Sequence, residues 1–594
     1  MISLLVSFTL TPMLAARLLK RSKITHEGHR TASRGGFYAI IGNSYTWLLR
    51  GAMRYRIPVA ILAILVVAAS IPLYGMVRQD YLPRDVDEGE FTISVNAREG
   101  TSFAAMDTVM QTIAAEVGKM PEITTVLSTA GGGFLDSTNS GRIYIRMVPH
   151  EARLFSIGRL ASCTLKGKPM EAFAHNYSQT DLMGRLRTMM HKYPGLRIAV
   201  RNMPQFSIGP GGNTDIQLVI RGPELERLGA FADQLRQQCA DGTIPGIADA
   251  DTSLKIEASE SRIRINREKA ADLGVSSQDV GSALRLMIGG DDQVSRYRDP
   301  QTNELYDVQI RLRESDRRDP SALPTLLLPR GSTGELVELR SLATIENQRI
   351  ASRIDRLNRQ RAASLSAAVA PGYALADRLA ALRVAVDSLQ MPAGYSVTIS
   401  GKGEELERTF VEFLWAFGLS VIFMYMILAS NYESLVHPLT ILLSLPLSVP
   451  FALLSLYLSD GTLNLYSALG MLVLFGVVKK NAILQIDHMN RLRVEGMPRF
   501  DAIIQGNRDR LRPILMTTIA LVAAMLPLAV GSGPGAQERR AVAIVVIGGQ
   551  SLSLLLTLLV TPVVYSLIDD LGARIRPVRK PADAEEAGIV ANAQ

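Results

Sequence analysis

The chain has 594 residues, of which 47% are apolar and 20% are charged, and its formal net charge is +8. This apolar content excludes an intrinsically disordered chain, and the positive mean hydropathy of +0.15 argues against a wholly soluble protein. The two cysteines, Cys163 and Cys239, are too few to form a disulfide framework or a four-cysteine zinc site by themselves.

The N-terminal stretch from Met1 to Ala16 is apolar but short for a complete membrane span. A signal peptide is the alternative, although no basic segment precedes the apolar part. Residues 3–14 share five of twelve positions with residues 553–564, including a Thr-Pro pair. This similarity favours a duplicated transporter in which residues 1–18 are the partial last helix of a first repeat.

Six further apolar runs predict membrane-spanning helices. Each reaches about 20 residues, the length that a helix needs to cross the hydrocarbon layer. Buried helices of a large soluble core are the alternative, but such helices seldom stay apolar on every face. The runs cover residues 57–77, 410–430, 438–458, 463–486, 513–531 and 541–568.

Residues 78–407 have an ordinary globular composition and form a large insert. Alternating patterns predict strands over 141–147 and 214–220. Helical patterns separate them, over 106–117, 224–239, 277–287 and 374–388. Strands that alternate with helices indicate α/β or α+β subdomains. The fold class that we expect is a helical polytopic membrane bundle with a large α+β insert.

Basic residues set the predicted orientation. Residues 17–56 hold nine lysines and arginines against one acid, Glu27, so this connector is expected in the cytoplasm. The loop over 488–512 and the tail over 569–594 are also basic, and both return to the same side. The insert then lies outside. The basic charge reflects this topology, and no nucleic-acid-binding motif accompanies it.

Ionisable residues inside apolar runs are candidates for function, because burying a charge in hydrocarbon costs at least about 2.5–3.5 kcal/mol. Lys480 belongs to the pair Lys479-Lys480 within an apolar run, and Asp487 follows Lys480 seven residues later on roughly the same helix face. Snorkelling to the interface is the alternative for both side chains.

The next run offers two more candidates, Arg510 and Thr517, which are also seven residues apart. Pro513 is expected in the first turn of this helix, which would leave Arg510 at the interface. Thr517 either bonds across helices or bonds back to its own helix. No carboxylate lies at the middle of any predicted span; Glu412 is near the outer end of one.

Three motifs resemble the C-terminal half of the resistance–nodulation–division (RND) transporters, of the hydrophobe/amphiphile (acriflavine-resistance) type. They are the segments over 431–439, 480–484 and 510–517, and the glycine-rich 531–536 and the Thr561-Pro562 pair also fit. The resemblance covers essentially the whole chain. It implies a homotrimer in the bacterial inner membrane, with a periplasmic adaptor protein and an outer-membrane channel as partners, and export driven by proton influx.

The resemblance also assigns roles to residues. Lys480, Arg510 and Thr517 match the family's proton-relay lysine, arginine and threonine, and Asp487 is a further candidate. The insert would form porter subdomains of ferredoxin-like βαβ type, with a docking subdomain inserted at about 261–348. The substrate-path candidates lie in the gating-loop position and in a second loop. They are Gly131, Gly132, Gly133, Phe134 and Phe206.

The family's paired aspartates belong to a first half that this sequence does not contain. We therefore expect half of a proton-driven efflux permease that is inactive without an N-terminal half as partner. The domain plan is 1–18 partial helix, 19–56 cytoplasmic connector, 57–77 helix, 78–407 periplasmic porter and docking domain, 408–568 five-helix bundle and 569–594 cytoplasmic tail.

Two alternatives remain for the function. One is a copper or silver exporter of the same family, with soft ligands from Met183, Met189, Met190 and Met203. The other is a non-transporting remnant or a scaffold that binds partners through residues 78–407. No nucleophile–base motif indicates an enzyme. We expect no cofactor and no bound metal, and we expect the helices to contact membrane lipid.

Overall fold

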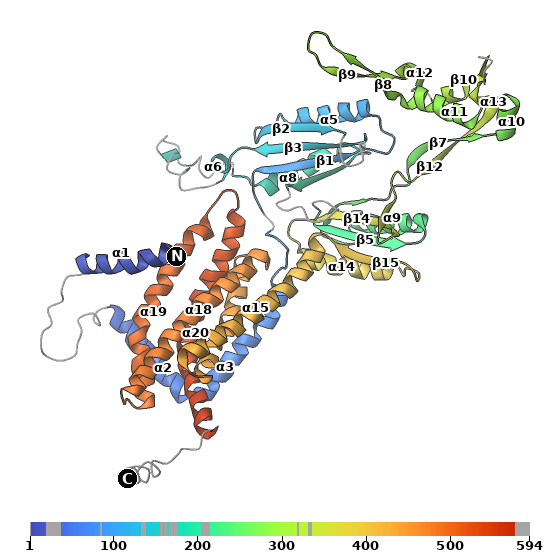
Figure 1. Cartoon of the computed structure of the whole chain (residues 1–594). Coiled ribbons are helices and arrows are strands. Elements are labelled where there is room, and N and C mark those ends of the chain that lie inside the picture. The colour runs from blue at the N-terminus through green and yellow to red at the C-terminus, as the bar shows by residue number, and fades with distance from the viewer. Residues whose placement is uncertain are drawn as a thin grey trace, which may run out of the picture.

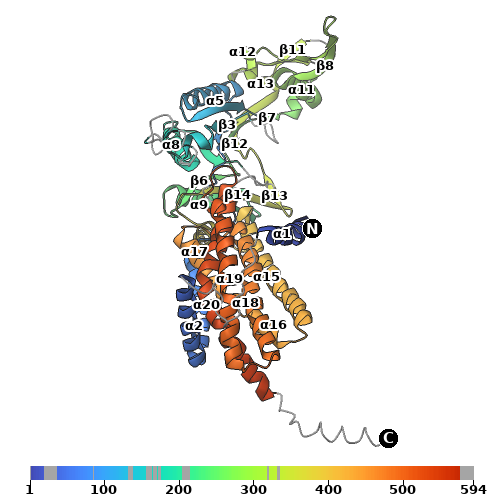
Figure 2. The same ribbon diagram turned by 90° about the vertical axis from the view of Figure 1, so that its left-hand side faces the viewer.

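The structure is a computed structural model that describes residues 2–18, 37–83, 86–131, 138–154, 159, 163–164, 170, 176–203, 214–317, 320–330 and 335–575. A helical bundle carries a large α+β insert at one end, and the last helix ends at the opposite end (Figure 1). The view at 90° shows the long helices side by side beneath the insert (Figure 2).

Six helical segments of the described chain are long and apolar enough to cross a membrane, as the apolar runs predicted. The helices before the insert are α1 (Ile2–Leu18), α2 (Phe37–Arg54), α3 (Arg56–Ala68) and α4 (Ser70–Met76). Those after the insert are α15 (Lys402–Tyr432), α16 (Val436–Leu442), η5 (Pro446–Ser448), α17 (Val449–Leu458), α18 (Leu465–Val494), α19 (Arg499–Val530) and α20 (Ala536–Ile575).

Prolines divide two of the spans. α3 ends at Ala68 and α16 ends at Leu442, each four residues before a proline, Pro72 and Pro446. A proline ring clashes with the carbonyl four residues earlier and offers no N–H, so the regular helix stops there. The first of these spans therefore consists of α3 and α4, and the second consists of α16, η5 and α17.

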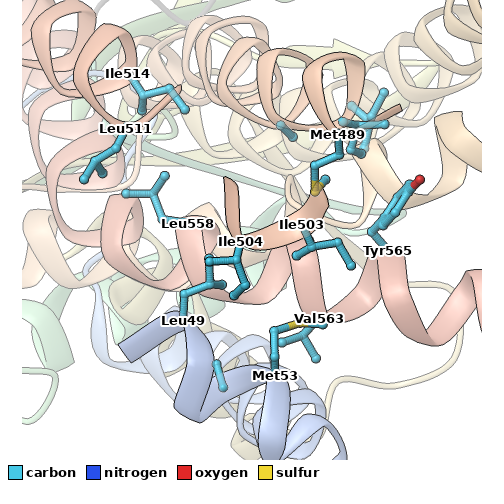
Figure 3. Close-up of a cluster of buried hydrophobic side chains, with 14 of the residues drawn as sticks. Leu49, Met53, Met489, Ile503, Ile504, Leu511, Ile514, Leu558, Val563 and Tyr565 are labelled. Atoms are coloured by element: carbon cyan, nitrogen blue, oxygen red, sulfur yellow. The ribbon is translucent and has the colours of Figure 1, made fainter. Parts of the chain in front are cut away.

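The predicted loop over 488–512 is wrong. α18 continues to Val494 and α19 begins at Arg499, so Pro513 lies inside α19 and not in its first turn. The helices extend because their ends bury apolar side chains against α2 and α20. Figure 3 shows this cluster, in which Leu49 and Met53 of α2 lie beside Ile503 and Ile504 of α19.

The insert begins with a βαββαβ unit. It consists of β1 (Glu90–Asn96), α5 (Phe103–Val117), β2 (Ile123–Ala130), β3 (Ser140–Met147), α6 (His150–Arg153), α8 (Gln179–Met190) and β4 (Arg197–Asn202). The four strands form an antiparallel sheet in the order β2-β3-β1-β4. Alternate side chains of β1, such as Phe91 and Ile93, point to the core formed with α5 and α8.

A second unit repeats this connectivity. It consists of β5 (Ile216–Gly222), α9 (Leu225–Ala240), β6 (Ile247–Thr252), β13 (Asp355–Leu357), β14 (Gln360–Val369), α14 (Leu375–Ser388) and β15 (Ser396–Ser400). β14 pairs with both β6 and β5, and β5 also pairs with β15. The order β6-β14-β5-β15 corresponds to β2-β3-β1-β4, so the insert contains an internal structural repeat.

A third subdomain interrupts the second unit between β6 and β14. The chain leaves through β7 (Ala258–Ile265) and returns through β12 (Ala343–Ile350), which pair antiparallel with each other. Between them lie α10 (Arg267–Asp272), α11 (Ser277–Leu284), η3 (Arg285–Gly289), β8 (Asp291–Arg298), β9 (Leu305–Ile310), α12 (Glu314–Arg317), η4 (Pro320–Thr325), β10 (Leu327–Arg330), β11 (Glu335–Glu338) and α13 (Leu339–Leu342). Figure 1 shows the β8–β9 hairpin at the outer end of the molecule.

Asp87 fastens the segment after α4 to the first unit of the insert. Its carboxylate pairs with both terminal nitrogens of Arg153, a fully buried side chain, and lies 3.0 Å from Nε2 of His150. The backbone N–H groups of Gln179 and Gly89 donate to the same carboxylate at 3.1 and 3.2 Å. Burial alone would raise the pKa of Asp87, but the hydrogen-bonded guanidinium overrides burial and lowers this pKa below its usual range.

We expect Asp87→Asn to destabilise the insert at neutral pH by about 3–5 kcal/mol, because Arg153 would keep a buried charge without its carboxylate. A lowered folded-state pKa means that this stability is present above the ordinary carboxyl pKa of about 3.9 and is lost as the pH falls through the lower folded value. The variant should therefore lose less stability on acidification. Thermal unfolding of the detergent-solubilised chain across this pH range measures both effects.

The matched control is Asp107→Asn, because Asp107 of α5 is only partly buried and bonds only the side chain of Gln111 among the described residues. Equal unfolding temperatures and equal acid dependence in the two variants would contradict the assignment.

Candidate functional site

Lys480 lies on an uncovered face of α18. Its side chain is exposed, as are Leu469, Val473 and Gly476, which precede it at spacings of four, three and four residues. These spacings place the four positions in one stripe along the helix. The opposite face, which includes Val478, is buried in the bundle. Lys480 is thus a cation on an apolar side of the bundle that the described helices leave open.

Thr517 lies at the same depth as Lys480 on the neighbouring antiparallel helix. The two helices are joined near their turn by His488 of α18 and Asp509 of α19, at 3.4 Å. Lys480 precedes His488 by eight residues on α18, and Thr517 follows Asp509 by eight residues on α19. Both positions are therefore about 12 Å from the contact along the helix axes. The Thr517 hydroxyl donates to the Ile514 carbonyl at 3.1 Å, which is the intrahelical alternative.

Asp487 and Arg510 are the other two proton-relay candidates. Each is one residue from the His488–Asp509 contact, so they lie closer to the turn between the helices than Lys480 and Thr517 do. Asp487 is half-exposed and lies 3.8 Å from Arg491 of its own helix. Arg510 is half-buried, and its Nε has no hydrogen-bond partner in the described part of the chain. Among the described residues, no hydrogen bond or ion pair joins either level across the two helices. The structure brings the four residues to two adjacent depths without connecting them.

A charged cluster that sequence reasoning missed ties the ends of α18, α19 and α20 together. The Tyr565 hydroxyl donates to Asn490 Oδ1 at 2.6 Å and accepts from Arg493 at 2.7 Å. Asp569 accepts from Arg493 at 3.2 Å and from Arg499 at 3.1 Å. The only signal in the sequence was Asp569 at the end of a long apolar run, and no spacing rule links it to arginines 70 residues away.

A cavity of about 540 Å³ lies where the two units of the insert meet the end of the bundle. α8 and β4 supply Met183, Arg187 and Arg201 to its wall, and the segment after β4 supplies Met203. Asp249 of the second unit lies 3.5 Å from Arg187. Burial raises the pKa of Asp249 above its usual range, although both arginines act to lower it. The wall therefore combines apolar surface with charged groups of both signs, since Asp80, Glu88 and Glu90 also line it.

The segment after α4 connects this cavity to the membrane bundle. Gln79 pairs with Leu463 in a parallel β-bridge. The Leu463 carbonyl accepts from the Asp80 N–H at 3.0 Å, and the Leu463 N–H donates to the Arg78 carbonyl at 2.7 Å. The Asp80 carboxylate accepts from the N–H of Leu375, the first residue of α14, at 2.9 Å. Since α18 begins directly after this loop, these hydrogen bonds join the start of α18 to the start of α14.

The substrate-path candidates fall mostly outside the described residues. Gly132, Gly133, Phe134 and Phe206 cannot be placed for this reason. Gly131 is the residue after β2. Its φ of 72° is a left-handed backbone conformation that favours glycine. A Cβ at this position would lie 3.3 Å from the Phe103 ring.

The methionines proposed as soft metal ligands pack mainly as core residues. Met183 and Met190 belong to the buried cluster of the first unit, and Met189 packs against it. Met203 and Met183 both border the cavity.

Comparisons with known proteins agree with this architecture. A family model described as the AcrB/AcrD/AcrF family matches residues 1–569. A protein named multidrug resistance protein MdtC from Erwinia tasmaniensis is 30% identical over 570 residues, which are 96% of this chain and 52% of that protein. The protein of the same name from Proteus mirabilis is 28% identical over 590 residues, 99% of this chain and 54% of that protein.

Solved structures show the same fold. Two crystal forms described as a heavy metal efflux pump superpose with TM-scores of 0.78 and 0.75, each at 24% identity. They cover 96% and 90% of this chain, and the chain covers 54% and 52% of them. The chain spans about half the length of the relatives that it matches. With a family model over nearly all of its length and six candidate spans, the chain belongs to the AcrB/AcrD/AcrF family of RND efflux transporters and is a multi-pass inner-membrane protein.

Proposed function

We propose that this chain is the C-terminal half of a proton-driven efflux permease that exports hydrophobic and amphiphilic compounds. The observation that carries the proposal is Lys480, an exposed cation on the uncovered apolar stripe of α18. A charge at this depth costs several kcal/mol in lipid unless a partner or water surrounds it. A second helical half with carboxylates at the depth of Lys480 and Thr517 would supply both the cover and the proton-carrying groups.

The remaining parts fit the same proposal. The two βαββαβ units would act as ferredoxin-like porter subdomains, and the subdomain between β7 and β12 as the docking part, as expected for 261–348. The cavity at their base would be part of the substrate path, since apolar surface with charged groups of both signs suits amphiphilic compounds. The assembly would be a trimer that works with a periplasmic adaptor and an outer-membrane channel. Neither an enzymatic activity nor a cofactor belongs to this proposal.

The metal-ion alternative has less support. Packing in the apolar core accounts for Met183 and Met190 without any ligand role. The crystal forms described as a heavy metal efflux pump share the fold at 24% identity. A non-transporting remnant would leave Lys480 without a function and without a partner for its charge.

The test is co-expression of the chain with a polypeptide that carries the N-terminal half of such a transporter, in cells or proteoliposomes loaded with a fluorescent amphiphilic dye. We expect dye export only when both halves and a proton gradient are present. Export by this chain alone, or no export by the pair at verified expression, would contradict the proposal.

We expect Lys480→Ala to abolish export by the assembled pair, because the relay loses its cation. Lys479→Ala is the matched control, since Lys479 is the adjacent residue, is half-buried and lies on a different face of α18. It should retain most of the export rate. Dye efflux at equal protein levels measures the difference, and comparable losses in the two variants would exclude a specific role for Lys480.

We expect Met203→Trp to reduce export of large dyes more than that of small ones, because the added ring fills part of the 540 Å³ cavity. Leu127→Trp controls for adding a tryptophan, since Leu127 is exposed on β2 and is not part of the cavity wall. The readout is the ratio of efflux rates for two dyes of different size. An unchanged ratio in Met203→Trp would place the substrate path elsewhere.

A further inference from the structure

A row of buried polar side chains follows the interface of α18, α19 and α20, on the faces turned away from the Lys480 stripe. All of its members are at most 5% exposed. We call it the polar row; it consists of Asn481 and Gln485 of α18, Asn507 and Thr518 of α19, and Gln550, Ser553, Thr557 and Thr561 of α20. On α20 the spacings are three, four and four residues, so these side chains share one helix face.

Contacts at both ends fix how α18 and α20 are aligned. Gly470 of α18 lies against Val542 of α20, because a Cβ at Gly470 would be 3.2 Å from the Val542 Cα. At the other end Arg493 donates to Tyr565 at 2.7 Å. Both pairs are 72 residues apart in the sequence, and the contacts of Leu474 with Gly549 and of Asn490 with Tyr565 are 75 residues apart. The two helices therefore run parallel with an offset of 72 to 75 residues.

This offset arranges the polar row in levels. Along the bundle axis, Asn481 lies within about one turn of Ser553, and Gln485 lies within about one turn of Thr557. The two levels are four residues, or about 6 Å, apart.

The row continues in both directions. Above these levels, Gln550 donates to Thr518 across the helices at 3.3 Å. Below them, Thr561 is level with Met489, whose sulfur lies 3.2 Å from Asn507 Nδ2.

Several polar atoms of the row have no hydrogen-bond partner in the described part of the chain. They are Oε1 of Gln550, Nε2 of Gln485, Oδ1 of Asn507 and Oγ1 of Thr561, and all are buried. The set contains one amide donor, two amide acceptors and one hydroxyl that can do both, at different depths, and water can satisfy such a mixture. Two hydrogen bonds of about 2.8 Å through one water span the distance between neighbouring levels. A metal cation would need several oxygens around one point, which these levels do not provide.

The row ends at the charged cluster of Tyr565, Arg493 and Asp569. The side chains of Arg493 and Asp569 are 34% and 30% exposed, so this end is in contact with solvent. The other end reaches Gln550 and Thr518 at about the depth of Lys480, because Thr518 is the residue after Thr517 and Gln550 bonds Thr518. The polar row therefore connects the solvent-exposed end of the bundle to the depth of the proposed relay.

We propose that the polar row holds a file of water molecules inside the α18–α19–α20 interface. This file of water would run from the charged cluster at the end of the bundle to the level of Lys480. It would lie inside the bundle, on the side of α18 opposite to the face that carries Lys480. The hydration follows from the described residues alone. The use of this route for protons rests on the proposed function.

The test is the reaction of single cysteines at Thr557 and Thr561 with 2-aminoethyl methanethiosulfonate. The background carries Cys163→Ser and Cys239→Ala, and inverted membrane vesicles expose the charged cluster to the reagent. Leu558→Cys, in the adjacent apolar cluster labelled in Figure 3, and Leu555→Cys, on the outer face, are the controls. We expect T557C and T561C to react at least about tenfold faster than both controls, because the reactive thiolate forms in water and not in apolar surroundings.

Equal and slow labelling at all four positions would overturn the proposal.

A second variant, Gln485→Met, keeps the proposal testable if the cysteine variants do not fold. In a dry interface this variant removes an unpaired amide and raises the thermal unfolding temperature, which contradicts hydration. In a hydrated interface it removes a partner from the waters and lowers that temperature.

Transport separates the two parts of the inference. If Gln485→Met slows proton-coupled export by the assembled pair, the row serves as a proton route. If labelling succeeds and export is unchanged, that role is excluded. A pair that exports nothing even without substitutions contradicts the proposed function, and the labelling result is independent of it.

Discussion

The cost of a polar or charged group in hydrocarbon determines how this bundle is organised. Apolar spans fold into helices because every backbone group is then bonded internally. Side chains that break the apolar pattern must find partners, and α18 carries them on two faces. Lys480 projects from the open face, whereas Asn481, the next residue, turns into the interface with α20. One helix thereby separates a charged surface that requires an external partner from a buried row of neutral polar groups.

The insert is attached to this bundle through few and specific contacts. Main-chain bonds of the segment after α4 with Leu463 place the start of α18 beside the start of α14. The Asp80 carboxylate makes the bond to α14, so a single side chain joins the two helices there. Asp87 and its buried partner Arg153 fix the other end of the same segment to the first unit. The segment after α4 is therefore bonded to the bundle and to both units of the insert.

The candidate site was only partly predictable. The spacing of seven residues placed Lys480 with Asp487 and Arg510 with Thr517, but it gave no relation between the two helices. The contact between His488 and Asp509 supplies that relation, and it depends on α18 and α19 extending beyond the apolar runs. The polar row was invisible as a unit, because isolated glutamines and threonines in three apolar segments have no common pattern until the helices are aligned.

The sequence by itself determined the number and approximate positions of the spans and the α+β character of the insert. Hydrophobic length and strand or helix periodicity are local properties, and residues 103–117 and 375–388 fold as helices close to where their patterns predicted. The tertiary structure decided the repeated βαββαβ topology, the extension of α19 before Pro513 and the alignment of α18 with α20. These features depend on contacts between residues far apart in the chain, such as Arg493 and Tyr565, and local pattern carries no information about which distant faces pack together.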